Sequence, residues 1–339
     1  MILLVGNFLS KHGFNPTAIE DLNSCLSTNY EVKNASDKKN PFFRLVDIIF
    51  LILNNHSKSK ILIVDVFSTK AILFSWIAII LGKICHIPYV PVLRGGDLAK
   101  KHSRNLVYFN YFLKKSKNVI CPSAYLAKNF LQINNSIKII PNYIDVKKII
   151  FTVRNSYRPS LLWVRSIHQI YNPEMAIHVL NKLRIQYPES TLCMVGPNKD
   201  NTHLILENLI NKYHLNSQIS FVGKLSKDEW YKLSENFDIF INTTNIDNYP
   251  VSVLEAMALG LPVISTNVGG MSELIDNNKT GFLIDKGDVN AMVNLIEKIV
   301  ENSLVGNKIA TNARKHAELH DKNVILPKWH ELINESYGE

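Results

Sequence analysis

Short runs of β-branched and other apolar residues alternate with longer segments of helical spacing along the whole chain. In the first half the short runs lie at 3–5, 61–66, 89–93, 118–121 and 138–140, and the helical segments at 42–55, 69–83 and 123–132. In the second half the expected strands are 161–165, 192–195, 219–222, 239–242 and 262–265, and the expected helices 173–186, 201–214, 226–235 and 251–259. This alternation predicts an α/β protein with two parallel, doubly wound sheets.

A polar, weakly periodic stretch at 144–159 separates the two halves. We place the boundary there, which predicts one Rossmann-like domain over 1–155 and a second over 156–322. Residues 323–339 show helical spacing and are expected to form a terminal helix that either crosses back to the first domain or packs elsewhere. Ligands of doubly wound folds bind at strand carboxyl ends, so a cleft between the domains is the expected site.

The segment from Asn242 to Gly270 carries the strongest chemical signal. A strand is expected to end at Asn242, and a polar loop leads to Pro250 at the start of a helix, where its missing N–H is tolerated. Gly260 and Pro262 then end that helix. The free N–H groups and the dipole at the helix start favour an anion, and a diphosphate would suit them.

Two carboxylates, Asp247 and Glu255, flank this helix start. They cannot help to hold a diphosphate, so we expect them to face neutral hydroxyls: a ribose diol for Glu255 and a sugar ring for Asp247. Each has a structural alternative. Ser252-x-x-Glu255 matches a capping box, and Asp247 suits a side-chain-stabilised turn.

These residues resemble the signature of the retaining glycosyltransferases of family four (group one), which have the GT-B fold of two Rossmann-like domains facing a central cleft. Asp247 stands where that family usually has Glu, and the matching residues are Glu255, Ala256, Met257, Ala258, Gly260, Pro262, Val263, Gly269 and Gly270. The resemblance implies transfer of a sugar from a nucleotide-diphosphate sugar to an acceptor hydroxyl, with retained anomeric configuration and front-face substitution.

The resemblance also implies roles for individual residues. Glu255 would bind the ribose, and Asp247 would contact donor-sugar hydroxyls near the anomeric centre. The loop backbone would bind sugar and phosphate through Tyr249, Pro250, Val251, Ser252 and Val253.

Arg165 ends the first strand of the second half, where the family has an Arg, and its guanidinium would grip a phosphate in catalysis. The alternative is an ordinary surface residue. The family's Lys about five residues further on is replaced by Ile170 and Tyr171, with His168 nearby.

Other positions match the family more weakly. Gly196 and the pair Lys224–Leu225 resemble strand-to-loop turns beside the nucleotide, and Gly13 matches a glycine loop facing the diphosphate. Arg94 stands where many members carry a catalytic His, and its alternative is a Gly-Gly turn between strand and helix.

Composition limits the choice of partner and compartment. The 38 Lys and Arg against 29 Asp and Glu give a net charge of +9, which indicates an anionic partner or a generic solubilising charge. The basic residues are scattered, so nucleic acid is not expected. Four isolated cysteines favour a reducing cytoplasm, and residues 1–6 have the pattern of a first strand rather than a signal peptide. The apolar run at 71–82 is too short to cross a bilayer and predicts a core helix or one at a membrane surface.

The sequence has no dinucleotide, Walker or hydrolase signature, and no Asp-x-Asp pair. We therefore expect a metal-independent enzyme without a cofactor, the nucleotide sugar being a co-substrate. The acceptor would be a carbohydrate or lipid-linked saccharide in bacterial surface polysaccharide or lipopolysaccharide synthesis, with peripheral contact at the inner face of an anionic membrane. The alternatives are a nucleotide-sugar epimerase or phosphorylase of the same fold, and a non-catalytic nucleotide-sugar-binding protein.

Overall fold

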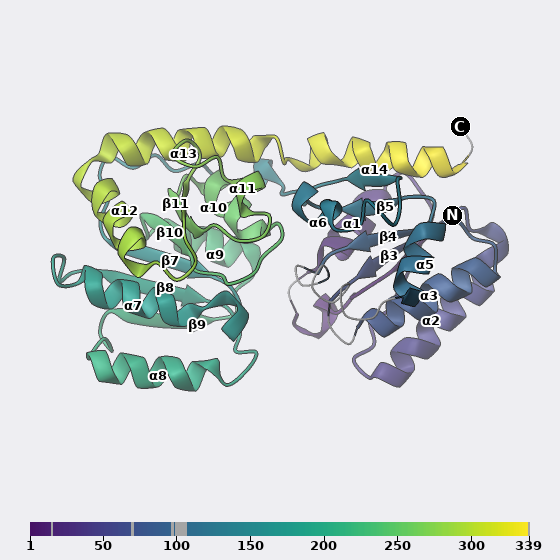
Figure 1. Ribbon diagram of the computed structural model, residues 1–339, viewed down its shortest axis with the longest axis horizontal. Coiled ribbons are helices and arrows are strands. Elements are labelled where there is room, and N and C mark those ends of the chain that lie inside the picture. The colour runs from purple at the N-terminus through teal and green to yellow at the C-terminus, as the bar shows by residue number, and fades with distance from the viewer. Residues whose placement is uncertain (15, 69–70, 96–97, 99–106, 338–339) are drawn as a thin grey trace. The chain divides into compact units, whose positions relative to one another are not determined.

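Two parallel sheets form the framework of the chain in the computed structural model, which describes residues 1–14, 16–68, 71–95, 98 and 107–337 (Figure 1). The chain divides into unit 1, Met1–Asn142 with Ile325–Glu339, and unit 2, Tyr143–Val324. The boundary expected between 155 and 156 therefore lies inside unit 2. The polar stretch that suggested it contains Ile144, Val146 and Ile149, whose side chains are buried in the core of unit 2.

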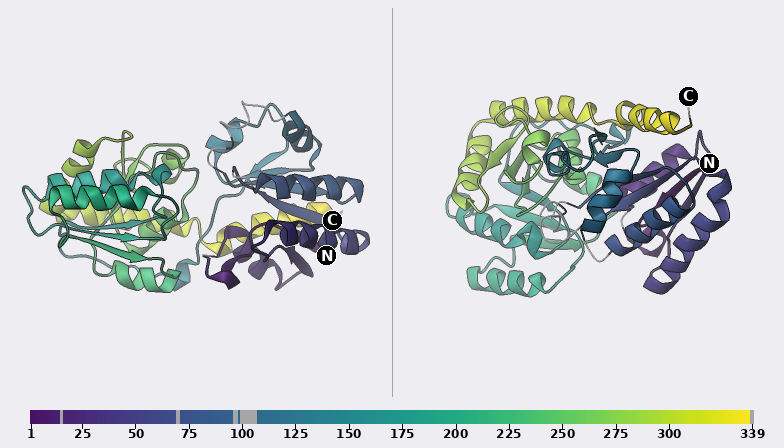
Figure 2. Two further views of the ribbon diagram at one scale, coloured as in Figure 1. Left: turned by 90° about the horizontal axis from the view of Figure 1, so that it is seen from below. Right: turned by 45° about the vertical axis from the view of Figure 1, so that its right-hand side comes forward.

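The sheet of unit 1 has the strand order β2-β1-β3-β4-β5-β6 in the described part of the chain. Its strands are β1 (Ile2–Val5), β2 (Val32–Ala35), β3 (Ile61–Val66), β4 (Tyr89–Leu93), β5 (Val119–Cys121) and β6 (Ile137–Ile139). The helices of unit 1 are α1 (Ala18–Leu26), α2 (Pro41–Asn55), α3 (Ile72–Ile84), α5 (Val107–Lys115), α6 (Ala124–Lys128) and most of α14 (Lys322–Tyr337). Helices cover both faces of this sheet (Figure 2), which is why its central strands are buried throughout rather than alternating between buried and exposed residues.

The sheet of unit 2 has the order β12-β11-β10-β7-β8-β9 in the described residues. Its strands are β7 (Ser160–Val164), β8 (Thr191–Val195), β9 (Ile219–Gly223), β10 (Ile239–Asn242), β11 (Val263–Thr266) and β12 (Phe282–Ile284). Its helices are α7 (Pro173–Leu183), α8 (Thr202–Tyr213), α9 (Lys227–Ser234), α10 (Val251–Leu259), α11 (Met271–Leu274), α12 (Val289–Glu301) and α13 (Ser303–Glu318). The strand order reverses direction between β7 and β10, so their carboxyl ends form the switch point of this sheet.

Each face of the second sheet has its own core. Successive residues of a strand point to opposite faces, so Leu161 and Trp163 pack in one buried cluster and Leu162 packs in the other. Helices α7 and α12 cover the first cluster, and α10 and α13 cover the second. The prediction of two doubly wound parallel sheets is confirmed.

Several elements were not predicted from the pattern. Strand β2 reads Val-Lys-Asn-Ala and has an exposed middle, because it lies at the sheet edge. Helix α13 buries small residues, among them Gly306, Ala310 and Ala313, and these give a weak hydrophobic period. Residues 69–70 of the expected helix over 69–83 lie outside the described residues.

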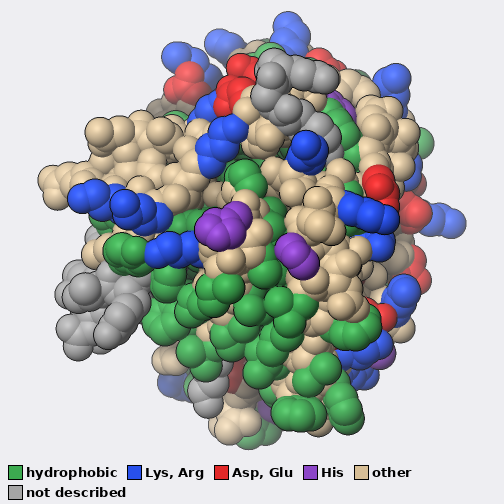
Figure 3. Space-filling model, turned by 90° about the vertical axis from the view of Figure 1, so that its right-hand side faces the viewer, with side chains coloured by type: hydrophobic (Ala, Val, Ile, Leu, Met, Phe, Trp, Pro, Cys, Tyr) green, Lys and Arg blue, Asp and Glu red, His purple; other side chains and the backbone are tan. Residues whose placement is uncertain are grey.

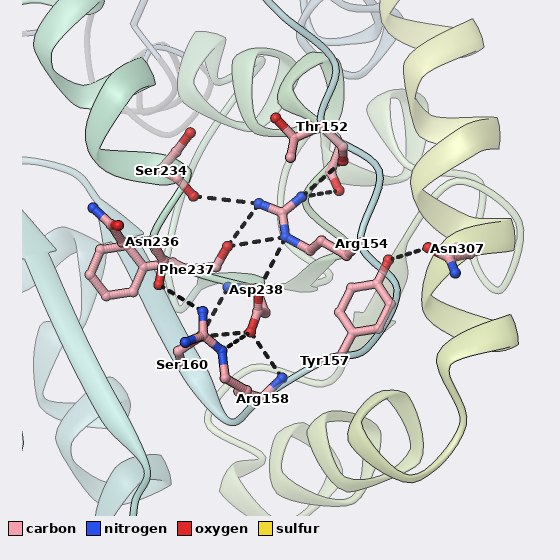
Figure 4. A network of polar contacts seen from close by, with 11 residues as sticks. Thr152, Arg154, Tyr157, Arg158, Ser160, Ser234, Asn236, Phe237, Asp238 and Asn307 are labelled. Carbon is pink, nitrogen blue, oxygen red and sulfur yellow. Dashed lines mark hydrogen bonds and ion pairs between the residues drawn. The ribbon is translucent and has the colours of Figure 1, made fainter.

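A buried ion pair ties the segment before β7 to the body of unit 2 (Figure 4). Arg154 is 7% exposed and donates to the carbonyl oxygens of Phe237, after α9, at 2.8 Å and of Gly260, after α10, at 2.9 Å. Its Nε also lies 3.3 Å from Asp238, and that carboxylate accepts from Arg158 Nε at 2.9 Å. One guanidinium thus donates to two carbonyl oxygens that lie just beyond the ends of α9 and α10. These carbonyls have no hydrogen-bond donor within their own helices.

None of the helices in the described residues is both long and apolar enough to span a bilayer.

Candidate functional site

Arg165 and Asp247 meet at the switch point of the second sheet. Arg165 directly follows β7, and Asp247 lies in the loop after β10, the strand that pairs with β7. Arg165 Nη2 donates to Asp247 Oδ2, and the two side chains are only 17% and 15% exposed. The surface-residue alternative for Arg165 is therefore wrong. Sequence reasoning selected both residues but did not pair them, because they are 82 positions apart.

The guanidinium of Arg165 has further capacity. Its carbon lies 5.0 Å from the ring centre of Tyr171, one of the residues in place of the family's Lys. Its Nε is buried and has no hydrogen-bond partner among the described residues. A hydrogen bond from a charged donor to an acceptor contributes about 1.5–3 kcal/mol, so this Nε favours an anionic ligand.

Two glycines allow the backbone to close around this pair. A Cβ at Gly196 would lie 1.8 Å from the carbonyl oxygen of Arg165, and a Cβ at Gly269 would lie 1.8 Å from that of Asp247. Both glycines also have positive φ, +147° and +60°. Since L side chains meet both a clash and strain there, these positions need glycine for the loops to approach so closely.

Asp247 is a carboxylate in a dry setting. Burial raises its pKa, and the neighbouring Arg165 guanidinium acts in the opposite direction. Its Oδ1 accepts from the Asn248 N–H at 2.9 Å, a local contact with the next residue. Each oxygen thus has one partner among the described residues, and a carboxylate with about four acceptor positions can also bind neutral hydroxyls.

Helix α10 begins beside this pair with an open N-terminus. Pro250 is the N-cap and makes no side-chain cap bond, so the helix supplies no acceptor for the N–H groups of Val251, Ser252 and Val253. The Ser252 hydroxyl is buried and lacks a partner within the described part of the chain. These donors and the helix dipole favour a negative charge, as the sequence predicted.

Glu255 lies deeper in α10 and is 4% exposed. Its Oε1 accepts from Tyr231 Oη at 2.8 Å and lies 3.3 Å from Lys227 Nζ. Ser252 is the second residue of the helix and not its cap, so the capping-box alternative is wrong. Sequence reasoning missed Tyr231 and Lys227, although their spacing of four on α9 places them on one face of that helix.

The other residues of unit 2 that were predicted to bind the donor lie at neighbouring strand ends. The Gly196 N–H donates to the Gly223 carbonyl at 2.7 Å, which joins the ends of β8 and β9. Lys224 follows as an exposed residue, and Leu225 packs against the apolar cluster under α10. His168 accepts from the Ile170 N–H at 3.0 Å and caps the short helix at Gln169–Tyr171.

Tyr249 was expected to contribute only backbone, but its side chain is anchored. It is 7% exposed, and its hydroxyl lies 2.6 Å from Nε2 of the buried His320. The sequence offered no signal for this contact because it joins residues 71 positions apart. The loop before α10 is thus fixed to the junction of α13 and α14.

Comparison with known proteins decides the family. The sequence model of the family described as glycosyl transferases group 1 matches residues 147–316, half of the chain. The chain belongs to the group 1 glycosyltransferases. The matched range holds the unit 2 site residues described above except His320, which lies outside it, as do Gly13 and Arg94.

Individual relatives of this group 1 chain are distant. An uncharacterised glycosyltransferase of Methanocaldococcus jannaschii is 24% identical over 68% of the chain and 64% of its own length. The capsular polysaccharide biosynthesis glycosyltransferase CapM of Staphylococcus aureus is 35% identical over 29% of the chain and 25% of its own length. The matches thus span less than two thirds of these relatives.

Solved structures support the fold. Sucrose-phosphate synthase from Thermosynechococcus elongatus superposes with a TM-score of 0.82 at 15% identity, covering 99% of both chains. HepE from Anabaena, in complex with UDP and glucose, has a TM-score of 0.78 at 19% identity over 98% of this chain and 99% of its own. The GT-B prediction is confirmed.

Unit 1 of this group 1 glycosyltransferase holds the last two predicted residues. Gly13 is exposed, has φ +81° and ends the short helix at Ser10–His12, and a Cβ there would meet nothing within 4 Å. Arg94 follows β4, donates to Asp65 Oδ1 at 3.1 Å and to Asn142 Oδ1 at 2.9 Å, and is 11% exposed. Gly96 of the Gly-Gly turn lies outside the described residues.

Asp65 was missed by the sequence reasoning. It is 2% exposed near the end of β3, and a charged residue inside an apolar strand was the available signal. Burial raises its pKa while Arg94 opposes that shift. Arg94 is therefore held by a buried carboxylate at the carboxyl edge of its own sheet.

Proposed function

We propose that the chain transfers a sugar from a nucleotide-diphosphate sugar to an acceptor hydroxyl with retention of configuration and without a metal. The observation that carries the proposal is the Arg165–Asp247 pair beside the open N-terminus of α10, at the β7–β10 switch point. Cationic and N–H donors stand there next to carboxylates, and a phosphorylated sugar has a chemical partner for both kinds of group.

The leaving diphosphate would be bound by Arg165 and the first amides of α10. Charge develops on that group as the glycosidic bond breaks, so donors already in place stabilise the transition state more than the ground state. In other enzymes, removal of a single hydrogen-bond donor to the transition state lowers kcat about 10²–10³-fold. This role is supported by the Nε of Arg165 and the hydroxyl of Ser252, both buried and without a partner in the part of the chain that the structure describes.

The carboxylates would orient the donor. Asp247 would accept from sugar hydroxyls near the anomeric centre, and Glu255, fixed by Tyr231 and Lys227, from the ribose. The departing diphosphate oxygen would take the proton of the acceptor hydroxyl, so no protein nucleophile is needed. Arg94, held by Asp65, would support the acceptor or the phosphate from unit 1.

We further propose a role in bacterial surface polysaccharide synthesis, with a saccharide or lipid-linked saccharide as acceptor. CapM is described as an enzyme of capsular polysaccharide biosynthesis. A second relative is described as a poly(ribitol-phosphate) α-N-acetylglucosaminyltransferase and is 30% identical over 30% of the chain. HepE was crystallised with UDP-glucose, which supports a nucleotide sugar as donor.

The test is a thermal-shift screen of UDP-, GDP- and ADP-sugars, followed by turnover of the best donor with saccharide acceptors. A ligand of the native state raises Tm by mass action. We expect one base to stabilise the chain, product to form in the presence of EDTA, and NMR to show the donor's anomeric configuration in the new linkage.

Failure of every nucleotide sugar to raise Tm would contradict the proposal. A stabilising donor without transfer or hydrolysis would indicate a binding protein instead. Free epimerised donor in the absence of any acceptor would indicate an epimerase.

A further inference from the structure

Helices α2 and α3 of unit 1 each have two apolar faces. Their inner faces bury Ile48 and Ile52 of α2 and Ala78 and Ile79 of α3 in one cluster against the sheet. A helix on the surface of a protein normally has a polar opposite face. These two do not.

The outward side chains are large and apolar. In α2 they are Phe42 (67% exposed), Phe43 (60%), Val46 (45%), Phe50 (66%) and Leu53 (45%), and in α3 Leu73 (54%), Ile80 (39%) and Ile84 (65%). Within each helix most of them repeat at three- or four-residue spacing, which aligns them along one side. We call these eight residues the outer α2–α3 face.

The outward side chains of α2 lie next to those of α3. The helices lie side by side in Figures 1 and 2, and the Arg44 guanidinium of α2 lies 5.0 Å from the ring centre of Phe74 in α3. Figure 3 shows hydrophobic side chains gathered over this side of the molecule, with Lys and Arg side chains beside them. Scattered apolar residues on a surface are ordinary, whereas a contiguous patch marks a binding surface.

The charges at the ends of this face indicate what it binds. Lys39 and Lys38, which pairs with Asp37 at 2.9 Å, precede α2. Lys58 and Lys60 follow α2, and Lys83 lies near the end of α3; all five lysines are exposed. Across both helices the sequence has a single acidic residue, Asp47. An apolar strip with cations at both ends complements the acyl region and headgroups of an anionic bilayer.

Tyr111 of α5 extends this arrangement. Its side chain is 44% exposed, and its hydroxyl accepts from Lys83 Nζ at 2.6 Å. Tyrosine beside lysine is typical of the interface between acyl chains and headgroups. A second copy packed antiparallel on the same face would instead bring Lys38 and Lys39 against Lys58 and Lys60, and like charges would repel.

We propose that the outer α2–α3 face is a peripheral docking surface for an anionic lipid bilayer. Its aromatic and aliphatic side chains enter the headgroup–acyl boundary, and the flanking lysines contact lipid phosphates. Docking needs neither sugar donor nor acceptor, so it stands or falls independently of the proposed reaction.

The test is co-sedimentation of the full chain with phosphatidylglycerol–phosphatidylcholine vesicles and with pure phosphatidylcholine vesicles. We expect binding to the anionic vesicles only, weakened by salt because exposed charges are screened. The triple variant F43S/F50S/I84S should bind at least about tenfold more weakly, since each side chain contributes apolar burial. K58Q/K60Q should bind at least about fivefold more weakly.

Matched controls carry the same changes in unit 2. I150S/I185S/L304S replaces side chains that are 76%, 81% and 77% exposed, and K286Q/K308Q removes two exposed lysines. Both should bind as the unmodified chain does, and an unchanged Tm shows that each variant is folded.

Three results would overturn the proposal. The first is an unmodified chain that stays in the supernatant with anionic vesicles at low salt, and the second is equal weakening in the control variants. The third is a chain that self-associates in solution and becomes monomeric as F43S/F50S/I84S, because a second copy would then cover the face.

Discussion

Glu255 illustrates how single side chains prepare this site. Its carboxylate is 4% exposed and is held by Tyr231 and Lys227 from a different helix. A ribose diol would thus meet an oriented carboxylate, and ordering that side chain would require little further entropy.

Replacement of Glu255 tests that role. Glu255→Ala should weaken donor affinity by about 1–3 kcal/mol, because ribose hydroxyls lose a charged acceptor. Isothermal titration with the best donor measures the change. Glu207→Ala, at an exposed position of α8, is the control and should leave affinity unchanged. If folded Glu255→Ala binds the donor with unaltered affinity, Glu255 does not bind the ribose.

A substitution of Arg165 can test whether the site needs only a positive charge or also the shape of the guanidinium. Arg165→Lys keeps the positive charge but loses the planar fork that binds Asp247 and, in the proposed reaction, would also bind a phosphate oxygen. We expect kcat to fall about 10²-fold or more, in the range found for removal of one transition-state donor. Steady-state kinetics give the answer, and an unchanged kcat would contradict a role in stabilising the leaving group.

At the scale of elements, the loops after β7 and β10 depend on glycine. Gly269 has positive φ, and its missing Cβ leaves room for the Asp247 carbonyl oxygen. Gly287 also has positive φ, +80°, but a Cβ there would meet nothing within 4 Å. An alanine at position 287 would therefore meet backbone strain alone, whereas an alanine at position 269 would meet strain and a clash.

Gly269→Ala should lower the free energy of unfolding by about 2–4 kcal/mol, since strain and a clash with backbone combine. Gly287→Ala should lower it by about 1 kcal/mol, from strain alone. Denaturant unfolding of the two variants compares them. Equal losses would mean that the approach of Asp247 to Gly269 is not needed for stability.

At the scale of the whole molecule, a histidine cluster lies where the chain passes from unit 2 into α14. The ring centres of His316 and His320 are 5.1 Å apart, and His320 holds Tyr249 in the loop before α10. Burial lowers the pKa of His316, and its Nε2 has no partner within the described residues. The folded chain therefore resists a proton that the unfolded chain accepts.

This gives a pH dependence of definite sign. The unfolded histidine takes up a proton as pH falls through about 6.5, so the contribution of neutral His316 to stability is present above that pH and is lost below it. Tm of the unmodified chain should therefore fall more steeply between neutral and mildly acidic pH than Tm of His316→Gln. The exposed His56→Gln should follow the unmodified chain. Parallel curves for all three would contradict the assignment.

The sequence by itself determined the architecture and the positions of the main site residues. Strand and helix periods are local, as are the Pro250 start and the Gly260 end of α10, so they can be predicted from neighbouring residues. Arg165 and Asp247 could be placed at strand carboxyl ends for the same reason. The resemblance to a known family supplied their expected chemistry.

Only the tertiary structure decided which groups meet. Strand order brings β7 beside β10 and so pairs Arg165 with Asp247, and helix packing brings Tyr231 to Glu255. It also decided that the apolar residues of α3 serve both a core and an outer face. Such contacts join residues far apart in the chain. A hydrophobic period indicates that a side chain is packed against apolar neighbours, but it does not indicate which element supplies those neighbours.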